Sequence, residues 1–248
     1  MLQYIKSENI KFKRGISRTL IFIVPIFLMV FNYFVCCSQS DLQKFFNMSV
    51  VNVWGLVFCS LGIAIYSCLS NAKDRNSGGY KALISKGADR FKLWCSKIFI
   101  IGTYMCMSSI FMFLLFMAWN YIFFGSCNFS FNVVLYVLYC CITVICLTPI
   151  SLFISYRFSD AINFIIGFII MCTSAVVATK DYWFIDPWCY PLRAACPLMG
   201  IHPNGTVLPA GNALWNASVI WYMPFILVVV FFISLFLTYK YFNNSEVK

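Results

Sequence analysis

Charged residues are scarce in this chain of 248 residues: only 10% are Asp, Glu, Lys or Arg, against about 25% in ordinary soluble domains. Hydrophobic residues make up 62% of the sequence, and phenylalanine alone fills 27 positions. A soluble fold of this size has too little interior to bury that much apolar surface. The composition therefore excludes a soluble globular protein and predicts an integral membrane protein.

Histidine is almost absent, which excludes several kinds of membrane enzyme. The single histidine, His202, lies between predicted spans, so neither an H-E-x-x-H metal pair nor an intramembrane Ser–His pair is present. The G-x-x-x-x-G-K-[ST] phosphate loop is missing as well, and no C-x-x-C pair occurs among the 13 cysteines. We therefore expect no enzymatic activity, cofactor or metal site in this chain, and any ATP hydrolysis must occur in a partner.

Long apolar runs are what the sequence has in abundance. A helix needs about 20 mostly apolar residues to cross a bilayer. Six runs qualify, and because they are continuous and do not alternate with polar residues, they predict helices and not a barrel. They cover residues 20–35, 50–69, 98–124, 131–156, 161–179 and 217–239.

The first run could instead be a cleaved signal peptide, since basic residues precede it. No A-x-A-like cleavage site follows, because the sequence there is "FVCCSQSD". We therefore expect the first run to be a retained span.

Basic residues gather on one predicted side. Fifteen of the 18 Lys and Arg residues lie in the N-terminal arm, in segment 71–97, at Arg157 or in the C-terminal tail. Because Lys and Arg near span ends mark the cytoplasmic face, both termini are expected in the cytoplasm. The same charge would attract anionic lipid headgroups, and no motif indicates nucleic acid as a partner.

No predicted span has an Asp, Glu, Lys or Arg in its middle. A proton-coupled pump needs a titratable relay and a voltage sensor needs stacked arginines, so both classes are excluded. Asn32, Asn52, Asn120 and Asn163 are polar but uncharged, and we expect hydrogen bonds between helices from them.

Residues 1–18 predict an amphipathic helix lying in the plane of the membrane surface. Leu2, Ile5, Phe12 and Ile16 fall near one face, and Lys11, Arg14 and Arg18 line another. Such a helix before the first span forms an elbow.

Segment 71–97 contains a second short helix. Gly78–Gly79 breaks the chain, Tyr80, Leu83 and Ile84 share one face, and Gly87 is a C-cap candidate. A basic helix displayed below the membrane suits docking in the groove of another protein or floating at the lipid surface, and the residues alone favour neither.

The string "GGYKALISKGADRFKLWCSK" resembles the coupling loop of ABC type-2 permeases. The matching residues are Gly79, Lys81, Leu83, Ser85, Arg90 and Lys97. The resemblance implies that this loop contacts an ATP-binding subunit, which would supply ATP and Mg²⁺ chemistry. The six spans, the elbow helix and the absent phosphate loop fit such a permease.

The outer segment, residues 180–216, is rich in Pro, Trp and Gly and is expected to fold back partly as re-entrant pieces. Cys189 and Cys196 could form a disulfide there, although free thiols are favoured. Its string "DPWCYPLR…PLMGIHPNG" resembles permeases of lantibiotic-immunity ABC transporters, in which related strings lie between the last two spans. The candidate substrate-path residues are Trp183, Pro187, Trp188, Tyr190, Pro191, Arg193, Pro203 and Asn204.

Together these features predict a single all-α, six-span permease domain over residues 1–248. The resemblances imply a bacterial multi-pass membrane protein that pairs with a second permease and two ATP-binding subunits and removes an antimicrobial peptide from the membrane. Two alternatives stay open: a type-2 permease for another lipophilic drug or lipid-linked cargo, and a non-transporting sensor or anchor.

Overall fold

The computed structural model describes residues 1–13, 15–76, 78–85, 87–125 and 130–244. Six helices in these ranges are long and apolar enough to cross a membrane, so the chain is an all-α, multi-pass membrane protein. They overlap all six predicted runs. Their bounds are Ile16–Cys36 (α2), Leu42–Asn76 (α3, η1 and α4 in continuous succession), Arg90–Phe124 (α6), Phe131–Arg157 (α7), Asp160–Val177 (α8) and Ser218–Asn244 (α10).

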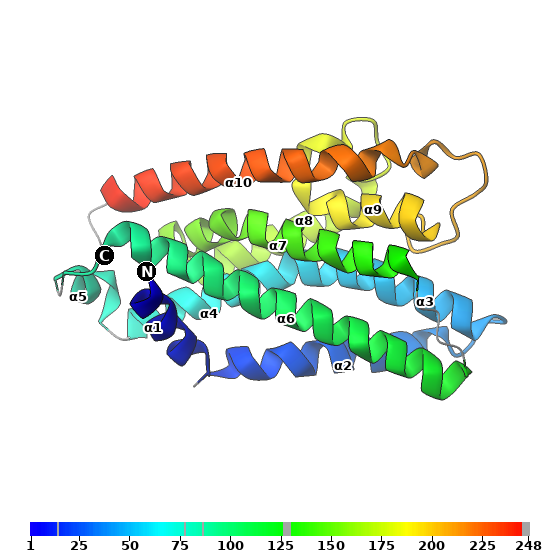
Figure 1. Cartoon of the computed structure of the whole chain (residues 1–248), viewed down its shortest axis with the longest axis horizontal. Helices are drawn as coiled ribbons and strands as arrows, with labels where there is room; N and C mark the ends of the chain where they lie inside the picture. Colours follow the sequence, from blue (N-terminus) through cyan, green and yellow to red (C-terminus); the bar gives the residue numbers. More distant parts are fainter. Residues whose placement is uncertain (14, 77, 86, 126–129, 245–248) are drawn as a thin grey trace.

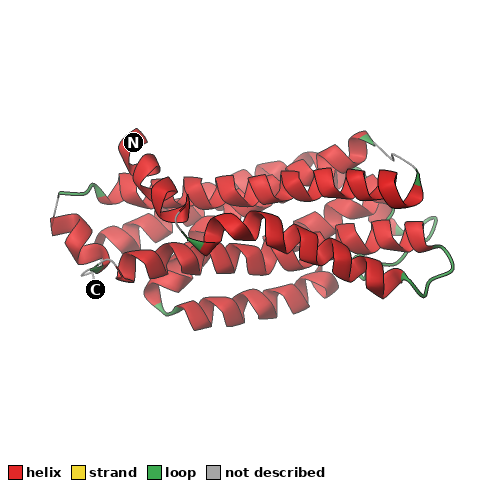
Figure 2. Ribbon diagram, turned by 90° about the horizontal axis from the view of Figure 1, so that it is seen from below, coloured by secondary structure: helices red, strands yellow, loops and turns green. Residues whose placement is uncertain are grey.

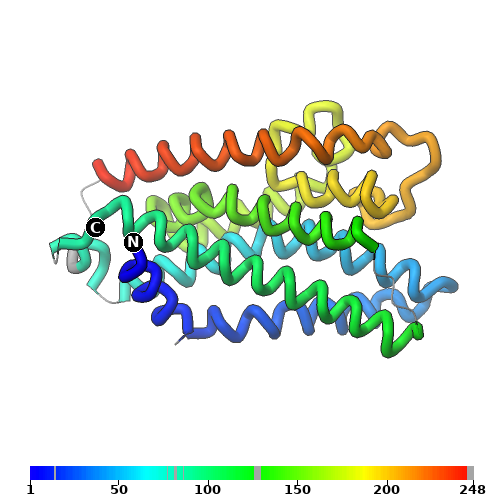
Figure 3. Tube along the Cα trace, in the orientation of Figure 1, coloured from blue at the N-terminus to red at the C-terminus, as the bar shows by residue number. Residues whose placement is uncertain are grey.

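The helices form one elongated bundle (Figures 1 and 3). α7 lies in the middle and packs against α4, α6, α8 and α10, while α6 also packs along α2. Two short helices, α1 (Leu2–Lys13) and α5 (Gly79–Ser85), lie at one end together with the end of α10, and we name this the basic end. The opposite end, where α3 begins and α9 (Tyr190–Met199) lies, is named the loop end. The view from below in Figure 2 shows the N-terminus and the end of α10 at the same end of the bundle.

The second spanning helix is much longer than predicted: residues 50–69 were expected and 35 residues are helical. It begins at Leu42, where the side chain of Asp41 caps it by accepting from the backbone N–H of Lys44 at 3.2 Å. The apolar run underestimates this helix because α3 is only partly apolar and its polar residues interrupted the run. At the other end the helix continues through Asp74 to Asn76.

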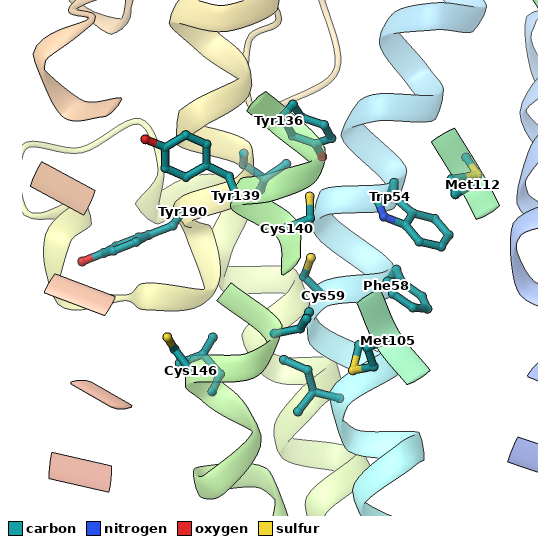
Figure 4. Close-up of a cluster of buried hydrophobic side chains, with 14 of the residues drawn as sticks. Trp54, Phe58, Cys59, Met105, Met112, Tyr136, Tyr139, Cys140, Cys146 and Tyr190 are labelled. Atoms are coloured by element: carbon teal, nitrogen blue, oxygen red, sulfur yellow. The ribbon is translucent and has the colours of Figure 1, made fainter. Parts of the chain in front are cut away.

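A π-helix, η1 (Trp54–Gly62), occupies the middle of this long helix. Tyr136 of α7 donates its hydroxyl to the carbonyl of Val51 at 2.7 Å, at the start of the wide turns. Gly55 makes room for that contact, because a Cβ at this position would lie 2.5 Å from the Tyr136 hydroxyl oxygen. Trp54 and Phe58 stack with ring centroids 4.0 Å apart on the α6 side of η1 (Figure 4). The π-helix is therefore stabilised by packing against α6 and α7.

The segment 180–216 folds into ordered structure against the bundle. It comprises η2 (Trp183–Ile185), η3 (Pro187–Cys189), α9 and η4 (Ala213–Trp215). α9 packs on α7 and η1, and Asn132 of α7 donates to the carbonyl of Leu198 at 2.8 Å. Asn52 of α3 likewise donates to the carbonyl of Pro203 at 2.9 Å. The position of this segment relative to a lipid bilayer stays a prediction.

Candidate functional site

The N-terminal helix α1 lies against the ends of α2, α4 and α6 at the basic end. It ends at Lys13, and Gly15, which precedes α2, has an extended backbone. The helix is therefore shorter than the predicted 1–18. Phe12 is fully buried, with its ring 5.0 Å from that of Tyr104. The predicted apolar face is only partly correct, because Leu2 and Ile16 are exposed. The buried face of α1 instead includes the carboxylate of Glu8.

Four charged side chains meet beneath α1 in a cluster that we name the ion quartet: Glu8, Asp74 and Lys97, which are buried, and Lys11, which is partly exposed. Lys11 Nζ lies 2.5 Å from Glu8 Oε1 and 2.6 Å from Asp74 Oδ1. Lys97 Nζ forms an ion pair with Asp74 Oδ2 and lies 3.7 Å from Glu8 Oε2. With two carboxylates and two ammonium groups the quartet is neutral overall, which is the condition under which buried charges are tolerated.

This quartet corrects the predicted bounds of the second and third spans, which ended at residue 69 and began at residue 98 and so left Asp74 and Lys97 outside both helices. Asp74 lies in the last turn of α4 and Lys97 lies in the second turn of α6, and neither is measurably exposed. The predicted loop 71–97 placed both in water. In the structure the helices extend over both residues and α1 covers them, so only residues 77–89 separate α4 from α6.

Further hydrogen bonds extend the quartet across the basic end. Lys97 Nζ also donates to Ser70 Oγ at 3.1 Å. Lys73 Nζ donates to the carbonyl of Lys11 at 2.8 Å and to Ser17 Oγ at 3.0 Å, and lies 4.5 Å from the Phe12 ring centroid. The first turn of α2, the second half of α1 and the end of α4 are therefore linked to one another.

Tyr80 anchors α5 to the bundle. Its hydroxyl donates to Asn71 Oδ1 at 2.6 Å, and Asn71 Nδ2 donates to the carbonyl of Leu152 at 3.1 Å and to Ser155 Oγ at 3.0 Å. The predicted short helix is confirmed over Gly79–Ser85, and Gly87 ends it with φ +79° while its N–H bonds to the carbonyl of Ile84.

An aromatic cluster surrounds the Tyr80 ring, with members from four helices. The rings of Tyr156 and Phe242 each lie 5.2 Å from the Tyr80 ring, both edge to face. Trp94 stacks on Phe242 at 4.8 Å and donates its indole N–H to Thr238 Oγ1 at 3.2 Å. Through this cluster α5 contacts α6, α7 and α10, in addition to its hydrogen bond to α4.

The six coupling-loop candidates fall into different environments. Gly79 begins α5 with φ +74°, Leu83 packs against the core, and Ser85 is exposed. Arg90 donates to the backbone carbonyls of Phe242 and Asn243, so it holds the end of α10. Lys97 belongs to the ion quartet. The backbone of Lys81 is helical, but its side chain lies outside the described residues, as does the whole of Lys86.

The candidates of the outer segment are brought together at the loop end, and most face inward. Trp183, Pro187, Tyr190, Pro191, Arg193 and Pro203 are buried, Trp188 is half-buried and Asn204 is exposed. The guanidinium of Arg193 donates to the carbonyl of Leu214 at 2.8 Å and lies 5.7 Å from the Trp183 ring centroid. These residues therefore build the internal packing of the segment and offer little surface of their own.

Titratable groups of the outer segment have shifted pKa values because they are buried. Burial raises the pKa of the Asp186 carboxyl, opposed by hydrogen bonds from Ser174 and Trp188. Burial also raises the pKa of the Cys196 thiol to about 11 and the pKa of the Cys189 thiol further. Cys189 and Cys196 are both free thiols, as favoured from the sequence. Cys127 lies outside the described residues.

An open cavity of about 530 Å³ lies between α3 and the outer segment. Its polar wall comes from the first turns of α3, with Asp41, Gln43, Lys44 and Asn47, and its apolar wall includes Met199 and Trp215. The α3 wall of this cavity was not predicted from the sequence, because the second span was expected to begin at residue 50. Within the described residues no group of three or more His, Cys, Asp or Glu side chains is placed to hold a metal ion.

Comparisons of the chain with protein-family models, with curated proteins and with solved structures give no match. The six long apolar helices therefore define the class, a multi-pass helical membrane protein. An assignment to a family or function depends on the arrangement of the residues described above.

Proposed function

We propose that this chain is the membrane-spanning subunit of an ATP-driven exporter of the ABC type-2 class. In this proposal the basic end is cytoplasmic, α5 is the coupling helix, and ATP and Mg²⁺ bind to a separate partner that docks below α5. The observation that supports it best is the attachment of Tyr80. A displacement of α5 would reach α4 through Asn71, and α6, α7 and α10 through the aromatic cluster.

The ion quartet suits a structural role in such a machine. It fixes α1 to α4 by the charge-assisted hydrogen bond from Lys11 to Asp74, a kind of bond that is stronger than a neutral one. It holds α6 through the ion pairs of Lys97 with Asp74 and, at 3.7 Å, with Glu8. A displacement of α5 would then move α1, α4 and α6 together and would not merely deform the segment around α5. The quartet has no open position for a reacting group, since each of its four members already faces an opposite charge.

The cargo that we propose is an antimicrobial peptide of the lantibiotic kind, removed from the membrane to protect the cell. Such amphipathic peptides combine apolar and polar surface, and the cavity between α3 and the outer segment has walls of both kinds. The second permease of the pair would complete the transport path.

The direct test compares bacterial cells that produce the ATP-binding partner and the second permease with this chain, without it, or with Tyr80→Ala. We expect the complete set to reduce sensitivity to the peptide, and Tyr80→Ala to restore sensitivity although the chain still reaches the membrane. Tyr182→Ala, which removes an exposed tyrosine of the outer segment, is the matched control.

Three outcomes would redirect the proposal. Equal peptide sensitivity with and without the chain would exclude the immunity role. Transport of a lipid-linked or drug cargo in reconstituted vesicles, without peptide transport, would favour the broader type-2 export function. Protection that persists when the ATP-binding partner cannot hydrolyse ATP would favour a sensor or anchor.

Orientation can be tested separately. Ser85→Cys places a thiol on the exposed side of α5, and a membrane-impermeant maleimide should label it only in inverted vesicles. Labelling in intact cells beyond that of the native chain, whose exposed Cys37 lies at the other end of the bundle, would contradict the cytoplasmic placement of the basic end.

A further inference from the structure

A second groove at the basic end lies between α1, α2 and α6. It has a volume of about 350 Å³, and α1 forms one of its walls. Ile5, Asn9 and Lys13 of α1 border it at intervals of four residues, which places them on one face of that helix. The remainder of the lining comes from α2 and α6 and includes Arg18, Phe22, Phe99, Thr103 and Met107.

Positive charge is confined to one end of this groove. Lys13 and Arg18 are both exposed, and no Asp or Glu is among the described residues that line the groove. The basic residues that form ion pairs in the described part of the chain are Lys11, Arg75, Lys92 and Lys97, so these two are not neutralised. The charges are therefore available to a mobile anion.

The wall beyond these charges is apolar and leads along the bundle. On α6 the lining runs from Phe99 through Thr103 to Met107, a path of about 12 Å at 1.5 Å per residue. Phe22, one turn beyond Arg18 on α2, lies on the opposite wall. Phe22, Phe99 and Met107 are each more than two-fifths exposed in the isolated chain. The groove is thus cationic at the bundle end and apolar towards the bundle middle.

We propose that this groove binds an anionic phospholipid, with its phosphate between Lys13 and Arg18 and one acyl chain along α6 towards Met107. A phospholipid has this same polarity, an anionic head joined to an apolar chain that points into the membrane. Basic pockets between spanning helices hold anionic headgroups by direct charge attraction. The site is independent of the transport role, and α1, which is fixed by the ion quartet, would hold the lipid at a defined place.

Native mass spectrometry of the detergent-purified protein tests the proposal, with dioleoyl phosphatidylglycerol and dioleoyl phosphatidylcholine as probes. We expect retained phosphatidylglycerol, with a preference over phosphatidylcholine of about tenfold or more, since each basic residue near an anionic headgroup contributes on the order of 1 kcal/mol. Lys13→Gln combined with Arg18→Gln should abolish that preference. Lys6→Gln, on the same helix but outside the groove, should leave it unchanged.

A second variant tests the apolar part. Met107→Trp should fill the deep end of the groove and reduce retention of both lipids, while the apparent melting temperature of the lipid-free protein shows that the fold is intact. Three results would overturn the proposal: an unchanged preference in the double variant, an equal loss in Lys6→Gln, or displacement of the lipid by millimolar inorganic phosphate, which would indicate a site for the free anion.

Discussion

The hydroxyl of Tyr80 donates a 2.6 Å hydrogen bond to Oδ1 of Asn71, and both side chains are buried at the junction of α4, α5 and α7. The side-chain nitrogen of Asn71 donates to the carbonyl of Leu152 and to Ser155 Oγ of α7, so these hydrogen bonds connect α5, α4 and α7. In a helix as short as α5, seven residues, such an anchor determines position more than helix propensity does.

Tyr80→Phe is expected to weaken this anchor without removing the ring. The Asn71 oxygen would lose its donor while staying buried, which costs about 1–3 kcal/mol. Tyr80→Ala would also leave a cavity in the aromatic cluster and cost about 3–5 kcal/mol. Chemical unfolding in mixed micelles measures both, with Tyr182→Phe as an exposed control. Equal stability of Tyr80→Phe and the native chain would contradict the anchoring role of the hydroxyl.

The ion quartet predicts strong coupling between Asp74 and Lys97. Asp74→Asn or Lys97→Met alone leaves an unbalanced buried charge and should cost about 3–5 kcal/mol. The double variant restores neutrality, since Glu8 and Lys11 still pair, and should be more stable than either single variant. Additive losses in this double-mutant cycle would show that the charges do not interact.

The exposed pair of Lys92 and Asp89, 3.2 Å apart, is the matched control for this cycle. Lys92→Met removes one charge in water and keeps the cap that Asp89 provides to α6. Its effect should stay below about 1 kcal/mol, because exposed ion pairs contribute little.

Gly55→Ala tests the packing of the π-helix. The added Cβ would lie 2.5 Å from the Tyr136 hydroxyl oxygen and 3.2 Å from Cβ of Pro191, so the Tyr136 side chain must move and Pro191 must give way by a few tenths of an ångström. Overpacking of this kind costs about 1–3 kcal/mol. Tyr136→Phe removes the clashing oxygen, so the double variant should lose less stability than the sum of the two single variants. A strictly additive result would mean that the hydroxyl is not what limits the space.

Asp186 predicts a pH dependence of stability with a defined sign. Burial raises the pKa of its carboxyl in the folded chain, so the folded state binds the proton more tightly than the unfolded state. Stability therefore falls as pH rises from about 4, the ordinary pKa of Asp, through the raised folded value, and then levels off.

Two substitutions separate the causes. Asp186→Asn keeps the size of the side chain and should remove this part of the slope in unfolding experiments across pH. Ser174→Ala removes a hydrogen bond of 3.0 Å that favours the charged carboxylate, so the fall should extend to higher pH. A slope that survives in Asp186→Asn would assign the effect to another group.

The spanning helices could be predicted from the sequence because each depends on a local property, a long apolar run. The short helix α5 and its Gly87 cap were also predictable, since spacing and a single glycine determine them. The ion quartet could not be predicted, because Lys11 and Asp74 are 63 residues apart and no local sequence pattern indicates that they pair. Glu8 gave a weak signal, being the only acidic residue before Asp41 in a strongly basic arm. The π-helix depends on contacts of Gly55 with α7 and α9, which sequence spacing does not reveal.

The ion quartet also constrains how the chain can assemble. Asp74 and Lys97 belong to consecutive spanning helices, and each would be an uncompensated charge if its helix entered lipid alone. Insertion of these two helices as a hairpin lets the charges neutralise each other from the outset. The helix α1, which precedes both helices in the chain, can dock only after they have formed, because Lys11 pairs with Asp74 and Glu8 with Lys97. The order of docking therefore differs from the order of synthesis: α1 is made before the two spanning helices that it packs on and takes its final position after them.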